Sequence, residues 1–86
     1  MAVQVADYYP VLKAAIAEAR AAGLEPGASE LEAQVLAAYT TSTELLGEHG
    51  IAILTFLRSQ GPAVPVPVAE KLNACLREIR KVWPDL

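Results

Sequence analysis

The residues of this sequence best equipped for chemistry lie in the stretch 39–50. It contains the only histidine, His49, and two carboxylates, Glu44 and Glu48, together with four consecutive hydroxyl residues at 40–43. Imidazole nitrogens and carboxylate oxygens are common ligands of metals such as zinc. One hypothesis is therefore a small ligand- or metal-binding site formed by Glu44, Glu48 and His49.

The spacing of these three residues departs from known metal-binding patterns. Glu44 and Glu48 are four residues apart, so a continuous helix would place both on one face. Di-metal carboxylate bundles use Glu-x-x-His, whereas His49 directly follows Glu48 and points about 100° away from it around a helix. One chain also supplies too few ligands, so the site would require two chains to pool residues at a subunit interface. The favoured interpretation is a solvated acidic face with a histidine at a helix end, and no metal or cofactor.

A nucleophile–base pair is the other chemistry that this stretch offers. His49 is a candidate general base, with Ser42 or Thr43 as the nucleophile. Ser42 and His49 are seven residues apart, which separates them by about two helical turns, beyond hydrogen-bonding distance. The sequence contains no Gly-x-Ser-x-Gly motif and no phosphate-binding glycine loop. We therefore expect that the chain is not an enzyme, and we assign no catalytic residue.

The size of the chain limits how its fold can be stabilised. Its 86 residues leave room for a single helical domain, residues 1–86. Small domains are usually reinforced by disulfides, a metal or oligomerisation. One cysteine excludes an intrachain disulfide, and one histidine with one cysteine cannot complete a four-ligand zinc site. Because 53% of the residues are apolar, oligomerisation is the expected reinforcement.

Charge and hydropathy exclude two classes of partner. The net charge of −3 argues against nucleic acid, since phosphate binding requires a basic surface. No apolar run approaches the roughly 18 residues of a membrane span. The first residues lack the basic region of a signal peptide. We expect no membrane association, and the free cysteine favours a cytoplasmic location.

Helical spacing of apolar residues and several end signals predict the first two helices. The first is expected over residues 8–22, with Asp7 as its N-cap. Alternatively it begins at Pro10, because a residue before proline disfavours the helical conformation. Gly23 is expected to end it in the left-handed conformation. A capping box formed by Ser29 and Glu32 is expected to begin the second helix.

The boundary between the second and third helices has two interpretations. In one, the second helix ends near Thr40 and a second capping box at residues 41–44 begins the third. In the other, which is favoured, one helix runs over residues 30–46 and breaks at Gly47 and Gly50. The two glycines, three apart on one face, could alternatively let a neighbouring helix approach closely.

The second half of the chain predicts two more helices and a stiff connector. Residues 51–58 should form a third helix that is buried from several sides, because apolar residues cover most of its circumference. A proline-rich connector should then lay Val64 and Val66 over the core. The fourth helix should begin near Pro67 and end at Pro84. Its apolar stripe comprises Val68, Leu72, Cys75, Leu76, Ile79, Val82 and Trp83.

Together these segments predict an all-α fold, a compact four-helix bundle with mostly antiparallel neighbours and no β-sheet. Acidic residues dominate the middle of the chain and basic residues its last third, so the two parts can pair within a bundle or between chains. The expected function is a non-catalytic helical interaction or assembly module. Its expected partner is a second copy, in a homodimer through the third or fourth helix, or another protein.

Overall fold

The computed structural model describes residues 3–37 and 42–86, and within them the chain forms helices and no strand. The α-helices are α1 (Tyr9–Ala21), α2 (Gly27–Leu36), α3 (Ser42–Gln60) and α4 (Val66–Ile79). A short 3-10 helix, η1 (Val5–Asp7), precedes α1, and a second, η2 (Gly61–Ala63), follows α3. No helix in these residues is both long enough and apolar enough to cross a membrane.

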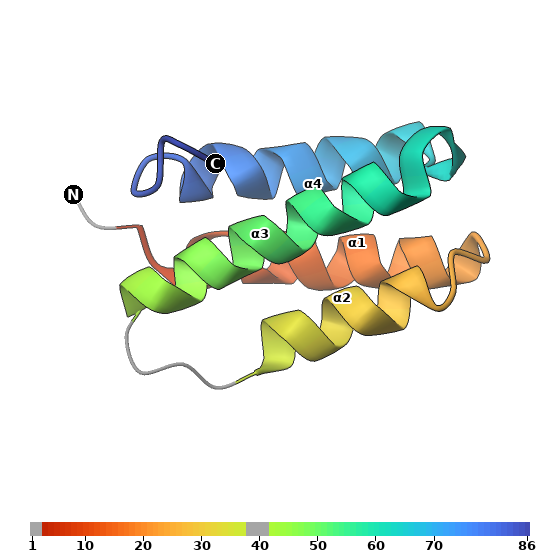
Figure 1. Ribbon diagram of the computed structural model, residues 1–86, viewed down its shortest axis with the longest axis horizontal. Helices are drawn as coiled ribbons and strands as arrows, with labels where there is room; N and C mark the ends of the chain where they lie inside the picture. The colour runs from red at the N-terminus through yellow and green to blue at the C-terminus, as the bar shows by residue number, and fades with distance from the viewer. Residues whose placement is uncertain (1–2, 38–41) are drawn as a thin grey trace.

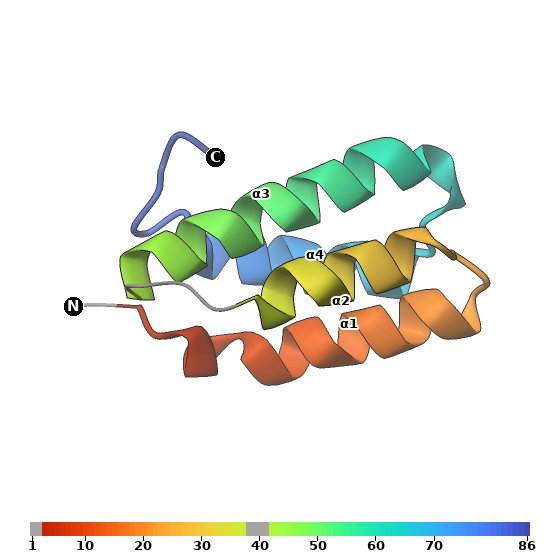
Figure 2. The ribbon, with the colours of Figure 1, turned by 60° about the horizontal axis from the view of Figure 1, so that its bottom comes forward.

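The four α-helices pack as a bundle in which neighbours in contact run antiparallel (Figures 1 and 2). The most extensive contacts join α1 to α4 and α2 to α3, and α1–α2 and α3–α4 contacts close the bundle. The predicted all-α four-helix bundle is therefore confirmed. The short connections between successive helices account for the antiparallel order.

The first helix spans nearly the predicted residues, but its predicted N-cap is wrong. Asp7 lies in η1, where its carboxylate accepts the backbone N–H of Gln4 at 2.8 Å, so it is not the N-cap of α1. Gly23 follows α1 with φ of 82°, in the left-handed region. The N–H of Leu24 bonds to the carbonyl of Ala19 at 3.1 Å, and the Leu24 side chain is buried. The chain thus reverses at the glycine that the sequence indicates.

The predicted capping box at the start of α2 is wrong. The helix begins at Gly27, so Ser29 already lies within its first turn. The carboxylate of Glu25 accepts both the backbone N–H of Ser29, at 2.9 Å, and its hydroxyl, at 2.7 Å. Glu32 instead accepts from Arg20, at 3.1 Å. A side chain outside the helix therefore caps it, and Glu32 connects α2 to the end of α1.

The favoured prediction of one helix over residues 30–46 is also wrong. α2 ends at Leu36, and Ala37 is extended, with φ of −64° and ψ of 145°. α3 begins at Ser42. The alternative capping box at residues 41–44 includes a residue outside the described part of the chain. The helical path is therefore interrupted before the glycines and not at them.

α3 continues unbroken through Gly47 and Gly50. Both glycines leave room for the C-terminal part of the chain to pack against α3. A Cβ on Gly47 would lie 3.2 Å from the ring of Trp83. A Cβ on Gly50 would overlap the side chain of Leu86 and lie 3.2 Å from a methyl carbon of Ile79. The prediction that these glycines break the helix is wrong, and close approach is their structural role.

The segment expected to be buried from several sides is less enclosed than predicted. Ala52, Ile53 and Phe56 are buried, whereas Ile51 is 50% exposed. Apolar residues around most of a helix predict burial, but α3 has neighbours on only part of its circumference (Figure 2).

The apolar stripe of α4 is largely confirmed, because its residues Val68, Leu72, Cys75, Leu76 and Ile79 are all buried. The helix ends at Ile79 and not at Pro84. The last residues turn back along the start of α3, where the Trp83 indole N–H donates to the carbonyl of Thr43 at 2.8 Å. Val66, predicted to cover the core, is 68% exposed.

Candidate functional site

The only histidine lies inside the bundle and not on its surface. His49 is 1% exposed, and both ring nitrogens have partners. Its Nδ1 lies 2.7 Å from the hydroxyl oxygen of Tyr8, and its Nε2 lies 3.1 Å from the backbone carbonyl oxygen of Val35. The ring therefore connects the start of α1, the end of α2 and the middle of α3.

These partners define the protonation state of the ring. The Val35 carbonyl can only accept, so the Nε2 atom of His49 carries a hydrogen and donates it. In the neutral ring Nδ1 is then an acceptor, and the Tyr8 hydroxyl donates to it. One neutral tautomer satisfies all three groups, and no buried side-chain nitrogen or oxygen among the described residues lacks a partner.

The bond to Val35 has a structural role. The last carbonyl groups of an α-helix receive no N–H donor from within the helix, so donors from elsewhere must satisfy them. Val35 lies in the final turn of α2, and His49 on α3 supplies the N–H that its carbonyl needs. His49 therefore holds the end of one helix against the middle of the next.

Aromatic and sulfur contacts extend this buried cluster. The Tyr9 ring stacks on His49, with centroids 6.3 Å apart and an interplanar angle of 23°. The Lys13 ammonium lies 5.8 Å from the centroid of Tyr9. The Cys75 thiol on α4 donates to the backbone carbonyl of Tyr8 at 3.8 Å. The Tyr8 and Tyr9 side chains thus contact the imidazole directly, and Lys13 and Cys75 contact these two tyrosines.

Burial shifts the pKa values of His49, Tyr8 and Cys75 in the direction that favours the neutral form of each group. It lowers the pKa of His49, although the hydrogen bond to the Val35 carbonyl opposes this. It raises the pKa of the Tyr8 hydroxyl, and the neighbouring Cys75 adds to this. It raises the pKa of the Cys75 thiol to about 11. A reactive cysteine needs a lowered pKa, so Cys75 is a packing residue.

The structure does not bring the predicted metal ligands together. Glu44 is exposed and Glu48 half-buried on the outside of α3, whereas His49 points into the core. The His49 nitrogens would have to give up Tyr8 and Val35 to reach a metal. In residues 3–37 and 42–86, no group of three or more His, Cys, Asp or Glu side chains could hold a metal ion. The geometry therefore gives this hypothesis no support.

The geometry also lacks a nucleophile for His49. Thr43 is exposed at the start of α3, while His49 is buried and bonded to Tyr8 and Val35. The side chain of Ser42, the other predicted candidate, lies outside the description of the structure. Among the described groups, the histidine acts as a hydrogen-bonding core residue.

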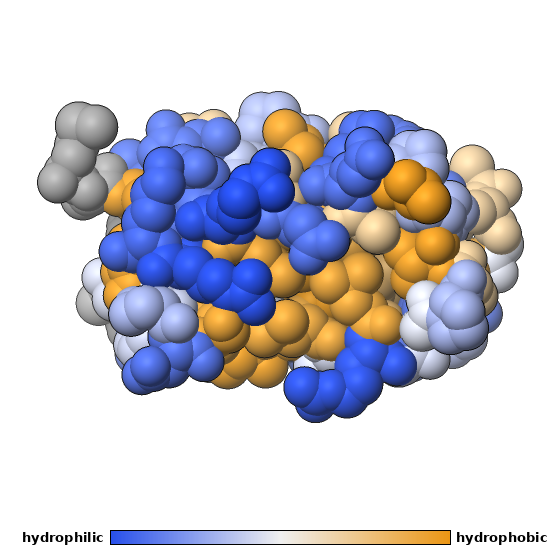
Figure 3. Space-filling model, turned by 90° about the horizontal axis from the view of Figure 1, so that it is seen from above, coloured by the Kyte–Doolittle hydropathy of each residue, from blue (hydrophilic) through white to orange (hydrophobic). Residues whose placement is uncertain are grey.

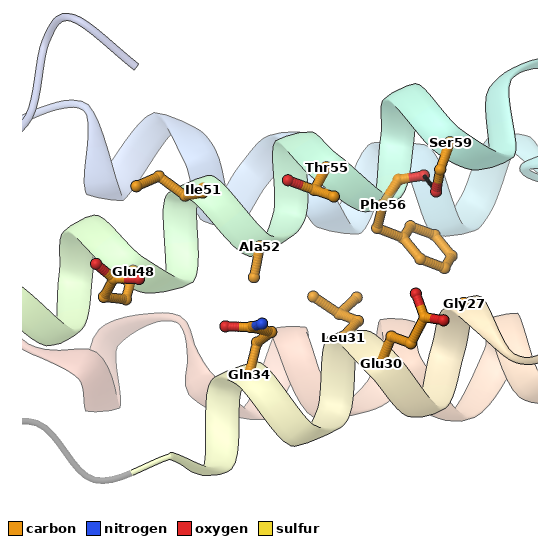
Figure 4. Close-up of a pocket in the computed structure, with 10 residues that line it drawn as sticks. All are labelled: Gly27, Glu30, Leu31, Gln34, Glu48, Ile51, Ala52, Thr55, Phe56 and Ser59. Atoms are coloured by element: carbon orange, nitrogen blue, oxygen red, sulfur yellow. Dashed lines mark hydrogen bonds between the residues drawn. The ribbon is translucent and has the colours of Figure 1, made fainter.

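Two of the surface depressions of the molecule lie beside α3. The first is a groove of about 280 Å³ between α2 and α3. Figure 4 shows Glu30 and Gln34 reaching into it from α2, opposite Ala52 and Phe56 of α3. Its apolar floor is bordered by carboxylates near both ends, so it has the character of a contact surface and not of an enclosed ligand cavity.

The second depression lies between α3 and the C-terminal residues and has a volume of about 310 Å³. Trp83, Leu86 and Ile51 form its apolar walls, and Glu48 is at its edge. Figure 3 shows apolar surface gathered across the side of the molecule seen from above, with hydrophilic side chains around it. Trp83 is 40% exposed and Ile51 is 50% exposed.

The sequence did not indicate either the buried hydrogen bonds of His49 or the exposed position of Ile51. It placed His49 at a helix end and named no partner for it, because Tyr8 is 41 residues away and no local pattern connects them. The exposed position of Ile51 was missed because the apolar run around it predicts burial. A seven-residue spacing of Glu44, Ile51 and Arg58 could have marked the exposed side of α3.

Comparisons with protein-family models, with curated proteins and with solved structures found no match for this chain.

Proposed function

We propose that this chain is a small, non-catalytic helical interaction module that self-associates as a homodimer. The observation that carries the proposal is the exposure of Ile51 beside Trp83 and Leu86, around an apolar depression on α3. The inner face of α3 already supplies Ile53 and Phe56 to the core. Core packing therefore does not explain why an apolar residue occupies the exposed position of Ile51. Exposed apolar surface of this kind is typical of interaction sites.

His49 and Cys75, the residues with the most reactive side-chain chemistry, are both buried and hydrogen-bonded. We further propose a reducing, cytoplasmic location, in which the single free thiol remains unoxidised.

The test is the oligomeric state of the purified chain as a function of concentration. We expect light scattering and sedimentation to show a monomer–dimer equilibrium between about 1 and 100 μM, the affinity range of modest interfaces. A mass equal to one chain throughout this range would contradict the proposal. Ile51→Gln should shift the equilibrium towards monomer, whereas the equivalent change at exposed Leu36 on α2, Leu36→Gln, should not.

A further inference from the structure

The exposed side of α3 has an ordered arrangement of charge and apolar surface. Glu44, Ile51 and Arg58 are spaced by seven residues and therefore lie on one side of the helix. All three are exposed, with Glu48 and Thr55 beside them. We call these five residues the outer ridge. Its order along the helix is acidic, apolar and basic.

A depression lies on each side of the outer ridge. The groove towards α2 and the depression towards the C-terminal residues both include Glu48 and Ile51 in their linings. The ridge is therefore raised between two hollows. Such a surface can fit a copy of itself, since the ridge of one molecule can enter a hollow of the other.

We infer that two copies of this chain pair through their outer ridges, with α3 antiparallel to α3 and the twofold axis at Ile51. This inference rests on the self-association proposed above and names the surface responsible for it. In this arrangement the Ile51 side chains of the two copies meet at the axis. Each lies against the apolar depression formed by Trp83 and Leu86 of the other copy.

Charge complementarity selects the antiparallel orientation. A twofold axis at Ile51 places Arg58 of one copy opposite Glu44 of the other, because both are seven residues from the axis. Glu44 also interacts within its own chain, and Glu48, one turn nearer the axis, offers Arg58 a second carboxylate. In the described part of the chain Arg58 makes no salt bridge. A parallel pair would instead place like charges together at both ends.

The dimensions of α3 suit such a pair. Its 19 residues extend about 28 Å at the usual helical rise, and the longest axis of the molecule is 36 Å. A standard interface buries about 800 Å² per partner, roughly a sixth of the 4980 Å² exposed by this chain. The outer ridge and the two depressions beside it would have to supply this area in each copy.

Cysteine cross-linking of the full chain locates the contact. Two helices packed at the usual separation of about 8–10 Å bring Cα atoms at the crossing point within disulfide range. Ile51→Cys should therefore form a covalent dimer under mild oxidation. Leu36→Cys is the matched control, because Leu36 is 65% exposed but lies on α2. The native Cys75 is buried and stays in both variants.

Charge reversal tests the orientation. Arg58→Glu should weaken dimerisation about tenfold, because two exposed attractive pairs become repulsive. The triple variant Arg58→Glu, Glu44→Arg and Glu48→Arg should regain the affinity, since it restores the pairs with opposite polarity. Circular dichroism of each variant checks that the fold is intact. Failure of the triple variant to regain affinity while Arg58→Glu loses it would overturn the antiparallel register.

The outcomes separate this inference from the proposed function. A dimer in solution that cross-links through Ile51→Cys and not through Leu36→Cys supports the α3 interface. A dimer in which Ile51→Cys reacts no faster than Leu36→Cys overturns it, while self-association stands. A chain that stays monomeric at all concentrations overturns both. Binding only to a different protein through Ile51 would likewise overturn the pairing of two copies.

Discussion

The two sides of α3 show how differently one helix can use neighbouring polar residues. His49 is 1% exposed and satisfied by Tyr8 and Val35, whereas Glu48, the residue before it, lines two surface depressions. Successive residues on a helix point about 100° apart, so adjacency in sequence separates these side chains. The inner side carries structural hydrogen bonds, and the outer ridge carries the features expected of a contact surface.

The largest effect should come from the inner side. His49→Ala would leave the Tyr8 hydroxyl and the Val35 carbonyl without partners and create a cavity. We expect a loss of about 3–5 kcal/mol in the free energy of unfolding, a large part of the stability of a domain this small. Urea denaturation would measure it. A loss below about 1 kcal/mol would show that the buried bonds are not structural.

The pH dependence of stability should come from the same residue. Burial lowers the pKa of folded His49 below its ordinary value of 6.5, so the unfolded chain takes up the proton first as the pH falls. The contribution of neutral His49 is fully present above pH 6.5 and is lost as the pH falls towards the folded pKa, by up to about 1.4 kcal/mol per pH unit.

Denaturation series between about pH 5 and 7 would test this, with His49→Gln as the control. Glutamine can donate and accept like the neutral imidazole but does not titrate. The slope in this pH range should therefore disappear in His49→Gln. An equal slope in both proteins would assign the pH dependence to other groups.

A smaller effect is expected where the C-terminal residues meet α3. Trp83→Phe keeps a ring over Gly47 but removes the indole N–H that donates to the Thr43 carbonyl at 2.8 Å. The free energy of unfolding should fall by about 1 kcal/mol, the usual contribution of one hydrogen bond. Thermal or urea denaturation followed by circular dichroism would measure the change. A loss as large as that of His49→Ala would remove the distinction between the two sides of the helix.

The smallest effect on stability should come from the outer ridge. Ile51→Gln replaces a side chain that is half exposed, so the free energy of unfolding of the monomer should change by no more than about 0.5 kcal/mol. Denaturation at a concentration below dimerisation would check this. A large loss would mean that Ile51 belongs to the core and would weaken its assignment to an interface.

The parts of this fold that the sequence predicts are those controlled by local patterns. The stripe of α4 follows from apolar spacing alone, and the end of α1 follows from a glycine in the left-handed conformation. The prediction for the start of α2 failed because the Glu25 carboxylate accepts the hydrogen bonds of Ser29, so the expected Ser29–Glu32 pair does not form. These residues are all near in sequence, but the choice between two acceptors depends on how the turn folds.

The features of the site that were missed depend on contacts between distant residues. Gly47 and Gly50 are helix breakers by intrinsic preference, yet Trp83, Ile79 and Leu86 pack into the space that they leave. His49 has the composition of a reactive residue and becomes a core residue only when Tyr8 reaches it. The spacing of apolar residues within a single helix cannot indicate contacts between residues this far apart in the sequence.

The packing of Trp83 over Gly47 also gives the protein a natural optical reporter. It is the only tryptophan in the chain, and it lines the same depression as Ile51. All tryptophan fluorescence therefore comes from one place at the edge of the outer ridge. A second molecule settling on that ridge would remove water from the indole and shift its emission to shorter wavelength, so dimerisation of the unlabelled native chain can be followed by dilution alone.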